Sequence, residues 1–260
     1  MNEFKRDAVS QTDPSSSEDW GERLFENTQE FADNPEPRCP CVLVLDTSRS
    51  MAGAPLAALE HGLQVFAQEL RKNTLACRRV EVAVVTFGAA VEVRQDFVTA
   101  GQFVPPSLTA RGETPLGSAI LRALDLVQTR KACYQANGVA YFRPWVFLIT
   151  DGMPQGEPLE VVRQCLERIK CVEAGRQAAF FAVAVEGANL QLLTRITVRP
   201  VLKLVDLRFA DLFTWLSRSA SQQAQGGELS QCSLPPLAWE IPSGENLSSQ
   251  ASLCVYGHES

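Results

Sequence analysis

The sequence predicts an α/β fold, in which a doubly wound, mostly parallel six-stranded sheet carries helices on both faces. Short, continuously apolar segments such as 41–46 (CVLVLD) and 144–150 (PWVFLIT) are typical of strands that are buried on both faces. Segments with apolar residues at helical spacing alternate with these strands along the chain. Strands that alternate with helices form parallel sheets between two helix layers.

Each element follows from its local pattern. In the segment 55–72, Leu59, Leu63 and Phe66 recur at helical spacing, and Pro55 suits the first turn of a helix. A short Gly-Ala-Ala turn joins two strand-like segments, so residues 90–98 are expected to form an antiparallel edge strand. The expected strands are 41–46, 79–88, 90–98, 144–150, 177–187 and 201–207, and the expected helices are 55–72, 115–134, 158–171, 188–196 and 209–223.

The two ends of the chain differ from this pattern. Residues 1–38 are rich in Ser, Asp, Glu, Asn and Pro and are predicted to be a polar, largely disordered extension. Within it, Ser17 suits the N-cap of a short amphipathic helix that would carry Trp20, Leu24, Phe25 and Phe31. The domain itself is expected over 39–222, and residues 223–260, which lack periodicity, form a C-terminal extension to which the sequence assigns no role.

Composition excludes several kinds of partner and site. The 260 residues carry a formal charge of -6 and no long basic run, which argues against nucleic acid or an anionic membrane surface as partner. No segment reaches the roughly 20 apolar residues that cross a bilayer, and the polar N-terminus lacks the apolar stretch of a signal peptide, so a cytoplasmic location is expected. Most of the eight cysteines fall in predicted strands or helices and are expected to be buried thiols. The only histidines, His61 and His258, are far apart in sequence, so no zinc site is expected.

Five oxygen-bearing residues follow expected strands or open an expected helix. Asp46, Ser48 and Ser50 come directly after the first buried strand, Asp151 follows the strand 144–150, and Thr114 lies in the loop before the helix 115–134. The carboxyl ends of the strands are where open α/β sheets place their ligand sites. Carboxylates and hydroxyls are hard ligands that suit Mg²⁺, with Mn²⁺ and Ca²⁺ as alternatives.

These residues and the segments around them resemble a known family. The segments VLVLDTSRSMAG, VVTFG, PPSLTARGETPLGSAI and PWVFLITDGMP resemble, in order and spacing, the metal-ion-dependent adhesion site (MIDAS) of von Willebrand factor type A (VWA) domains. The likeness covers 39–222 and is nearest to the TerY-like subgroup of bacterial proteins associated with tellurite resistance. It implies the strand order 3-2-1-4-5-6.

The resemblance also implies how such a site works. Ser48 and Ser50 would bind the metal directly, Thr114 directly or through water, and Asp46 and Asp151 mostly through water. One coordination position would remain for a carboxylate of a protein partner. For the TerY-like subgroup, it implies an adaptor in a bacterial stress-response or signalling complex, with an associated protein kinase or phosphatase as a candidate partner.

Two residues depart from the family pattern, which usually has Gly at both positions. Arg49 either points outward towards an acidic partner or competes with the metal for the carboxylates. Glu113 either weakens binding of an acidic partner or fills the open coordination position itself. Both are therefore candidate partner-contact residues.

Other interpretations of the motif remain open. Ser48 and Ser50 also suit helix capping alone. The chain lacks a phosphate-binding GxxxxGK[ST] loop, a GxGxxG fingerprint and a GxSxG elbow, so no enzyme activity is expected. The alternatives are a metal-independent scaffold with a decayed site and a metal-dependent phosphatase that uses Asp46 and Asp151. The phosphatase lacks an evident general base beside the hydroxyls.

Overall fold

The structure, a computed structural model, describes residues 31–152, 154–204, 206–226 and 239–240. The chain divides into two compact units, Met1–Pro35 and Glu36–Ser260. In the first unit, residues 31–33 are helical. The rest of the amphipathic helix expected after Ser17, and most of the extension 223–260, lie outside the described residues. The domain limits 39–222 stay a prediction.

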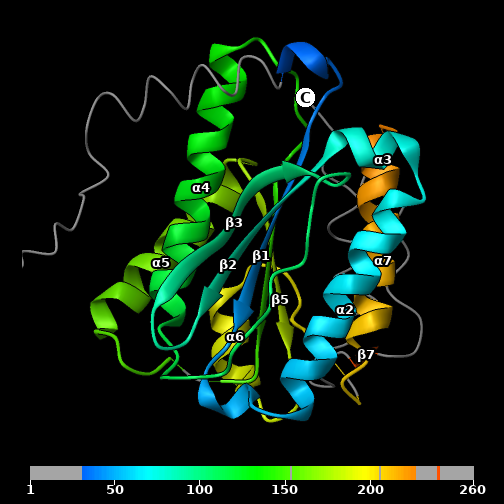
Figure 1. The fold of residues 1–260 in the computed structure, drawn as a ribbon. Helices are drawn as coiled ribbons and strands as arrows, with labels where there is room; N and C mark the ends of the chain where they lie inside the picture. Colours follow the sequence, from blue (N-terminus) through cyan, green and yellow to red (C-terminus); the bar gives the residue numbers. More distant parts are fainter. Residues whose placement is uncertain (1–30, 153, 205, 227–238, 241–260) are drawn as a thin grey trace, which may run out of the picture. The chain divides into compact units, whose positions relative to one another are not determined.

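The second unit is built on one sheet (Figure 1) with the strand order β3-β2-β1-β4-β5-β6-β7. The strands are β1 (Cys39–Asp46), β2 (Val80–Phe87), β3 (Val91–Thr99), β4 (Trp145–Thr150), β5 (Ala179–Ala184), β6 (Leu202–Leu204) and β7 (Trp239–Glu240). Strands β2, β1, β4, β5 and β6 are parallel, and β3 runs antiparallel to β2 at one edge. The predicted order 3-2-1-4-5-6 and the antiparallel edge strand are therefore confirmed. The two-residue β7, antiparallel to β6, is an addition that the sequence did not indicate.

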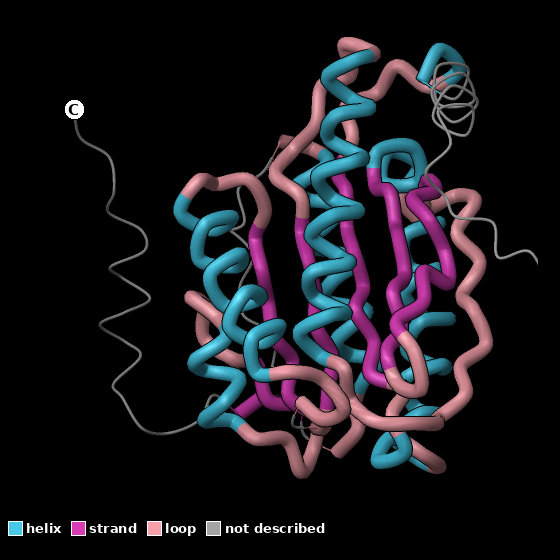
Figure 2. Tube along the Cα trace, turned by 90° about the vertical axis from the view of Figure 1, so that its left-hand side faces the viewer, coloured by secondary structure: helices cyan, strands magenta, loops and turns pink. Residues whose placement is uncertain are grey.

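Helices cover both faces of the sheet. They are α2 (Ala54–Arg71), α3 (Thr74–Arg79), α4 (Leu116–Ala136), α5 (Leu159–Ala174), α6 (Leu190–Ile196) and α7 (Phe209–Ala224), with a 3-10 turn, η1 (Arg49–Met51), after β1. One face packs against α2, α3 and α7, and the other against α4, α5 and α6, the face turned towards the viewer in Figure 2. Helix α3 was not predicted. Its signal is Asn73, whose Oδ1 accepts hydrogen bonds from the backbone N–H groups of Leu75 and Ala76.

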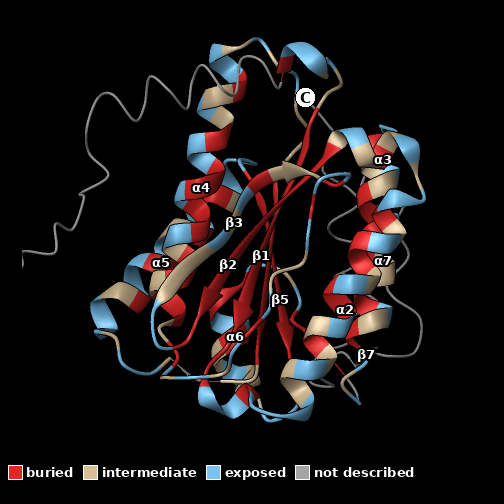
Figure 3. Ribbon diagram, viewed as in Figure 1, coloured by how far each residue is buried: buried red, intermediate tan, exposed pale blue. Residues whose placement is uncertain are grey.

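The central strands are buried along their whole length, which explains their uninterrupted apolar sequence (Figure 3). Alternate residues enter opposite cores: Val82 and Val84 face α2 and α7, whereas Ala83 and Val85 face α4. The six cysteines in the described ranges are free thiols. In the part of the chain that the structure describes, no helix has the length and apolarity to cross a membrane.

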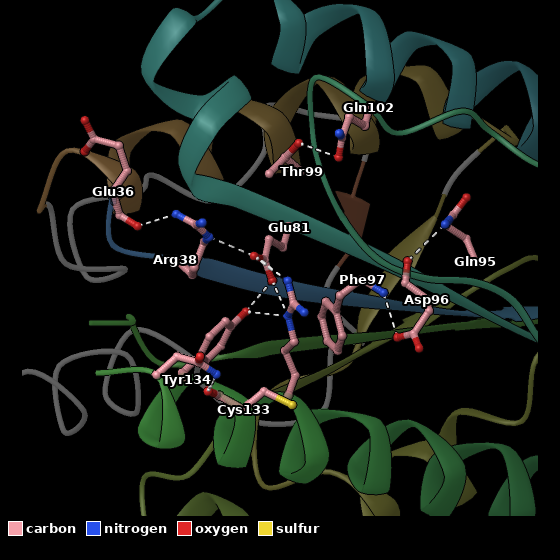
Figure 4. A network of polar contacts seen from close by, with 12 residues as sticks. Glu36, Arg38, Glu81, Gln95, Asp96, Phe97, Thr99, Gln102, Cys133 and Tyr134 are labelled. Atoms are coloured by element: carbon pink, nitrogen blue, oxygen red, sulfur yellow. Dashed lines mark hydrogen bonds and ion pairs between the residues drawn. The ribbon is translucent and has the colours of Figure 1, made fainter. Parts of the chain in front are cut away.

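A buried charge cluster closes the amino end of the sheet (Figure 4). We call Arg38, Glu81, Arg130 and Tyr134 the Glu81 cluster. The Glu81 carboxylate accepts hydrogen bonds from Arg38 Nε at 2.9 Å, from Arg130 Nε and Nη2 at 2.8 Å each, and from the Tyr134 hydroxyl. Arg38, Glu81 and Tyr134 are fully buried. The cluster thus joins the starts of β1 and β2 to the last turns of α4, at the end opposite the predicted metal site.

Candidate metal site

The loop after β1 folds back around the carboxylate of Asp46. Asp46 is the last residue of β1 and is fully buried. Its Oδ1 accepts a hydrogen bond from Ser48 N at 2.8 Å, and its Oδ2 accepts one from Thr150 Oγ1 at 2.5 Å. Thr47 fixes the loop to β2, because its N and its Oγ1 both donate to Phe87 O, at 2.7 and 2.9 Å. Asp46 is therefore held in one orientation by the ends of two neighbouring strands.

The other predicted residues extend from Asp46 towards solvent. Ser48 Oγ lies 3.0 Å from Ser50 Oγ, and Ser50 Oγ donates to Asp151 Oδ1 at 2.8 Å. Asp151 is half-buried directly after β4, and Ser50 is exposed. The structure thus links the loop after β1 to the loop after β4 through a continuous chain of hydroxyl and carboxylate groups.

Thr114 completes the group from a third loop. A methyl group placed on Gly152 would lie 3.2 Å from Thr114 Oγ1 and 3.5 Å from Asp46 Oδ2, so both oxygens flank the same spot. The backbone of Thr114 is fixed to the loop after β4, because its carbonyl accepts a hydrogen bond from Gln155 N at 2.9 Å. All five predicted residues therefore converge at the carboxyl edge of the sheet.

The electrostatics of this edge suit a cation. Burial raises the pKa of Asp46 above its ordinary value, and the nearby Asp151 raises it further, whereas hydrogen bonds from Ser48 and Thr150 oppose the shift. Burial likewise raises the pKa of Asp151, against the hydrogen bond from Ser50. No Lys, Arg or His within the described ranges forms an ion pair with either carboxylate. Two carboxylates without a basic partner are stabilised by a bound cation.

The two residues that depart from the family pattern do not contact the carboxylates. Arg49 is exposed, and its side chain forms no hydrogen bond or ion pair with any residue that the structure describes. Its backbone N donates to Gly112 O at 3.3 Å. The exposed side chain of Glu113 lies against Gly156, where an added methyl group would clash with Glu113 Oε2. This arrangement favours the outward orientation for Arg49 and places the Glu113 carboxylate beside the loop after β4.

Two residues of the site were missed from the sequence. Thr150 is buried and bridges Asp46 and Gly152, because its hydroxyl donates to the Asp46 carboxylate and accepts from Gly152 N at 3.1 Å. Its place just before Asp151 at the end of a buried strand is the signal for this role. Glu157 caps the start of α4 and accepts hydrogen bonds from Gly117 N at 2.7 Å and from Ser118 N at 2.9 Å. That contact spans 40 residues and leaves no local pattern.

The donor set fits a hard cation. No group of three or more His, Cys, Asp or Glu residues in the described chain is arranged to hold a metal ion. The converging group instead offers two carboxylates and three hydroxyls, which suits Mg²⁺, Mn²⁺ or Ca²⁺ better than thiolate- or imidazole-binding metals. The chemistry of the residues present therefore fits the ion that the motif implies.

Comparison with known protein families gives a match to part of the chain. Residues 41–153 match the family described as "von Willebrand factor type A domain". No curated protein sequence matches the chain.

Several solved structures share the fold. The pilus adhesin SpaC of Lactobacillus rhamnosus GG, in an open conformation, is 14% identical with a TM-score of 0.59, over 73% of this chain and 31% of SpaC. The vWF domain of the type V pili tip protein Mfa5 of Porphyromonas gingivalis is 12% identical with a TM-score of 0.56, over 74% of this chain and 98% of that domain. A mutant of the PilB minor pilin of Streptococcus sanguinis is 11% identical with a TM-score of 0.55, over 72% of this chain and 62% of the pilin. The chain thus spans less than a third of SpaC. The family match covers residues 41–153, and the strand order is consistent with the fold of von Willebrand factor type A domains.

Proposed function

We propose that this chain is a non-enzymatic, Mg²⁺-dependent module that binds an acidic side chain of a protein partner. The observation that supports it is the convergence of two carboxylates and three hydroxyls from three loops, without a basic residue to neutralise them. The residues that would hold the ion are Asp46, Ser48, Ser50, Thr114 and Asp151. When bound there, Mg²⁺ supplies an electrophilic position for a partner carboxylate.

The chain's own residues determine how a partner approaches. Asp46 is buried and held by Thr150, so it forms the inner wall of the site. Ser50 is exposed and Asp151 half-buried, so they form the open side. The exposed guanidinium of Arg49 sits in the same loop and is free to pair with acidic groups around the partner's contact residue. Because hydrogen bonds already fix the loops, little ordering is required when a partner binds.

The wider role is also part of the proposal. Among the proteins of similar fold, one is named a pilus adhesin and one a pilus tip protein, which supports a binding role for this chain. We further propose a cytoplasmic adaptor in a bacterial stress-response complex of the TerY-like type, with an associated kinase or phosphatase as partner. This placement rests on the motif resemblance described above.

Metal-dependent stability tests the proposal. We would measure urea unfolding of the full chain in MgCl₂ and in EDTA for the wild type, Asp46→Asn and the control Asp125→Asn, whose carboxylate is exposed on α4 and pairs with Arg168. At an Mg²⁺ concentration 100 times its Kd, the wild type and the control should gain about 2.7 kcal/mol. Asp46→Asn should lose this gain yet remain folded without metal, because it removes a buried carboxylate whose pKa is raised.

Two further outcomes distinguish the alternatives. A wild type with equal stability in MgCl₂ and EDTA would replace the proposal with the metal-independent scaffold. Metal-dependent hydrolysis of p-nitrophenyl phosphate that Asp46→Asn abolishes would replace it with the phosphatase.

A further inference from the structure

A second polar feature lies next to the candidate metal site. A cavity of about 120 Å³ opens between the ends of the β2–β3 hairpin and the loop that precedes α4. We call it the hairpin pocket; its lining includes Thr47, Thr86, Glu92, Arg94, Ser107 and Arg111. A cavity of this size holds several water molecules and admits a carboxylate side-chain end.

The two arginines of the pocket retain most of their hydrogen-bonding capacity. Arg94 Nη1 donates to Glu92 Oε2 at 3.2 Å, and Arg111 Nη2 lies 3.4 Å from Glu92 Oε1. Both distances exceed the roughly 2.7–2.9 Å of a tight charge-assisted hydrogen bond. Each guanidinium has five N–H donors and forms no other side-chain contact within the described residues. Two arginines and one glutamate leave the pocket with a net charge of one positive unit.

Thr86 contributes a hydroxyl to the wall of the pocket. It is only 6% exposed, yet its side chain forms no hydrogen bond with the residues that the structure describes. Thr86 pairs with Glu92 across the hairpin, so the two side chains point to the same face of the sheet, where the pocket lies. The hydroxyl is not one of the buried side-chain atoms that lack a partner in the described residues, so solvent reaches it and it is available to a ligand oxygen.

A register irregularity places Arg94 beside them. Val84 pairs with Gln95 and Val85 with Val93, so Arg94 is the extra residue on β3. Such a bulge redirects a side chain relative to the regular alternation of a strand. Arg94 and Glu92 therefore both line the same pocket.

The pocket shares a wall with the metal-site loop. Thr47 lines the pocket and lies in the chain between Asp46 and Ser48. Its carbonyl accepts a hydrogen bond from Arg111 N at 2.8 Å. Consecutive Cα atoms are about 3.8 Å apart. An extended partner chain, which advances about 3.3 Å per residue, spans the distance from one feature to the other in very few residues.

We infer that the hairpin pocket binds the carboxylate of a second acidic side chain of the same partner, one to three positions from the residue at the metal site. This inference rests on the proposed function. A single carboxylate matches the pocket's net charge of one, whereas Glu92 would repel a more highly charged phosphate group. The partner's recognition segment would then contain two acidic residues close together, which gives selectivity over proteins with a lone exposed acid.

Short peptides test the inference. We would titrate the ¹⁵N-labelled full chain with capped, glycine-based peptides in MgCl₂ and follow the amide shifts. Three peptides carry a second Asp one, two or three positions after the first, and each has a matched peptide with Asn in its place. At least one of the three should bind about tenfold more tightly than its Asn partner, as expected for new hydrogen bonds between charged groups.

Variants localise the effect. Arg94→Gln combined with Arg111→Gln should remove the preference for two Asp residues and leave the affinity for the Asn peptides unchanged. Thr86→Val, which removes only the hydroxyl, should reduce the preference. The control combines Arg163→Gln and Arg168→Gln, two exposed arginines of α5 with single acidic partners, and should keep it. Equal binding of all Asp and Asn peptides, or an unchanged preference in the Arg94/Arg111 double variant, would overturn the inference.

The two proposals fail in different ways. If Mg²⁺ does not strengthen binding of the Asn peptides to the wild type, the proposed function fails. The pocket is then tested in Asp46→Asn, where two-Asp peptides should still shift the amides of Thr86, Arg94 and Arg111 more than the Asn peptides do. Absence of that difference would overturn the pocket as well.

Discussion

Replacing Glu81 by Gln should destabilise the protein strongly, although the two side chains have nearly the same shape. The buried carboxylate accepts four hydrogen bonds, two on each oxygen. Its Oε2 accepts the hydrogen bonds from Arg130 Nε and the Tyr134 hydroxyl, and its Oε1 accepts the other two. In Glu81→Gln one oxygen becomes an NH₂ group that faces donors. Two hydrogen bonds to a charged group, at about 1.5–3 kcal/mol each, are then lost. The resulting 3–6 kcal/mol agrees with the roughly 3–5 kcal/mol expected when one partner of a buried ion pair is removed.

Urea and thermal unfolding, followed by circular dichroism, measure this loss. For a domain of this size, each kcal/mol lowers the Tm by roughly 2–4 °C, so a decrease of about 6–24 °C is expected. The control is Glu69→Gln, whose carboxylate pairs with the exposed Lys72 and should contribute no more than about 0.5 kcal/mol. If Glu81→Gln cost as little as this control, the Glu81 cluster would not hold β1, β2 and α4 together.

Three further changes test other parts of the fold. Burial raises the pKa of the Tyr134 phenol well above its ordinary value of 10, so the phenol stays neutral in the folded state at a pH where it ionises in the unfolded state. The free energy of unfolding should therefore fall as the pH rises above about 10, by up to about 1.4 kcal/mol per pH unit. The urea midpoint of Tyr134→Phe should lack this part of the pH dependence. Burial raises the pKa of Cys41 and of Cys165 to about 12, so iodoacetamide at pH 8 should label the exposed Cys171 and leave these two unmodified in native protein, as read by mass spectrometry. Gly62→Ala should lower the free energy of unfolding, measured in urea, by about 1–3 kcal/mol, because the added methyl group would lie 2.7 Å from Phe213 Cδ2. At Gly101 the added methyl group would lie 3.6 Å from its nearest neighbour, so Gly101→Ala should be nearly neutral.

Most of the fold could be predicted because its signals are long and redundant. β1, β2, β4 and β5 are each buried along their whole length, so their apolar sequence is uninterrupted. Short elements lack this redundancy. Helix α3 has six residues and one capping signal, Asn73, and β7 has two residues in a segment without periodicity.

The convergence of the candidate metal-site residues could be predicted because it follows from the topology of the sheet. Parallel strands bring their carboxyl ends to one edge, so residues that follow β1 and β4 meet whatever their separation in sequence. The contacts that support the site could not be predicted in this way. Glu157 contacts the start of α4 only because the fold brings together residues that are 40 positions apart in the sequence. The hairpin pocket depends on a bulge at Arg94, which no residue pattern predicts.

The metal-site loop and the hairpin pocket are joined through Gly88. A methyl group at Gly88 would lie 2.5 Å from Arg111 O and 2.6 Å from Thr47 O, so only glycine lets the β2–β3 turn approach both backbones. Through this contact the turn, the metal-site loop and the loop before α4 form one closely packed support. Thr47 belongs to that support and also lies between two of the candidate metal-binding residues. A partner that engages both features would therefore meet side chains already held in place, so more of the contact energy remains for selecting a partner with two acidic residues.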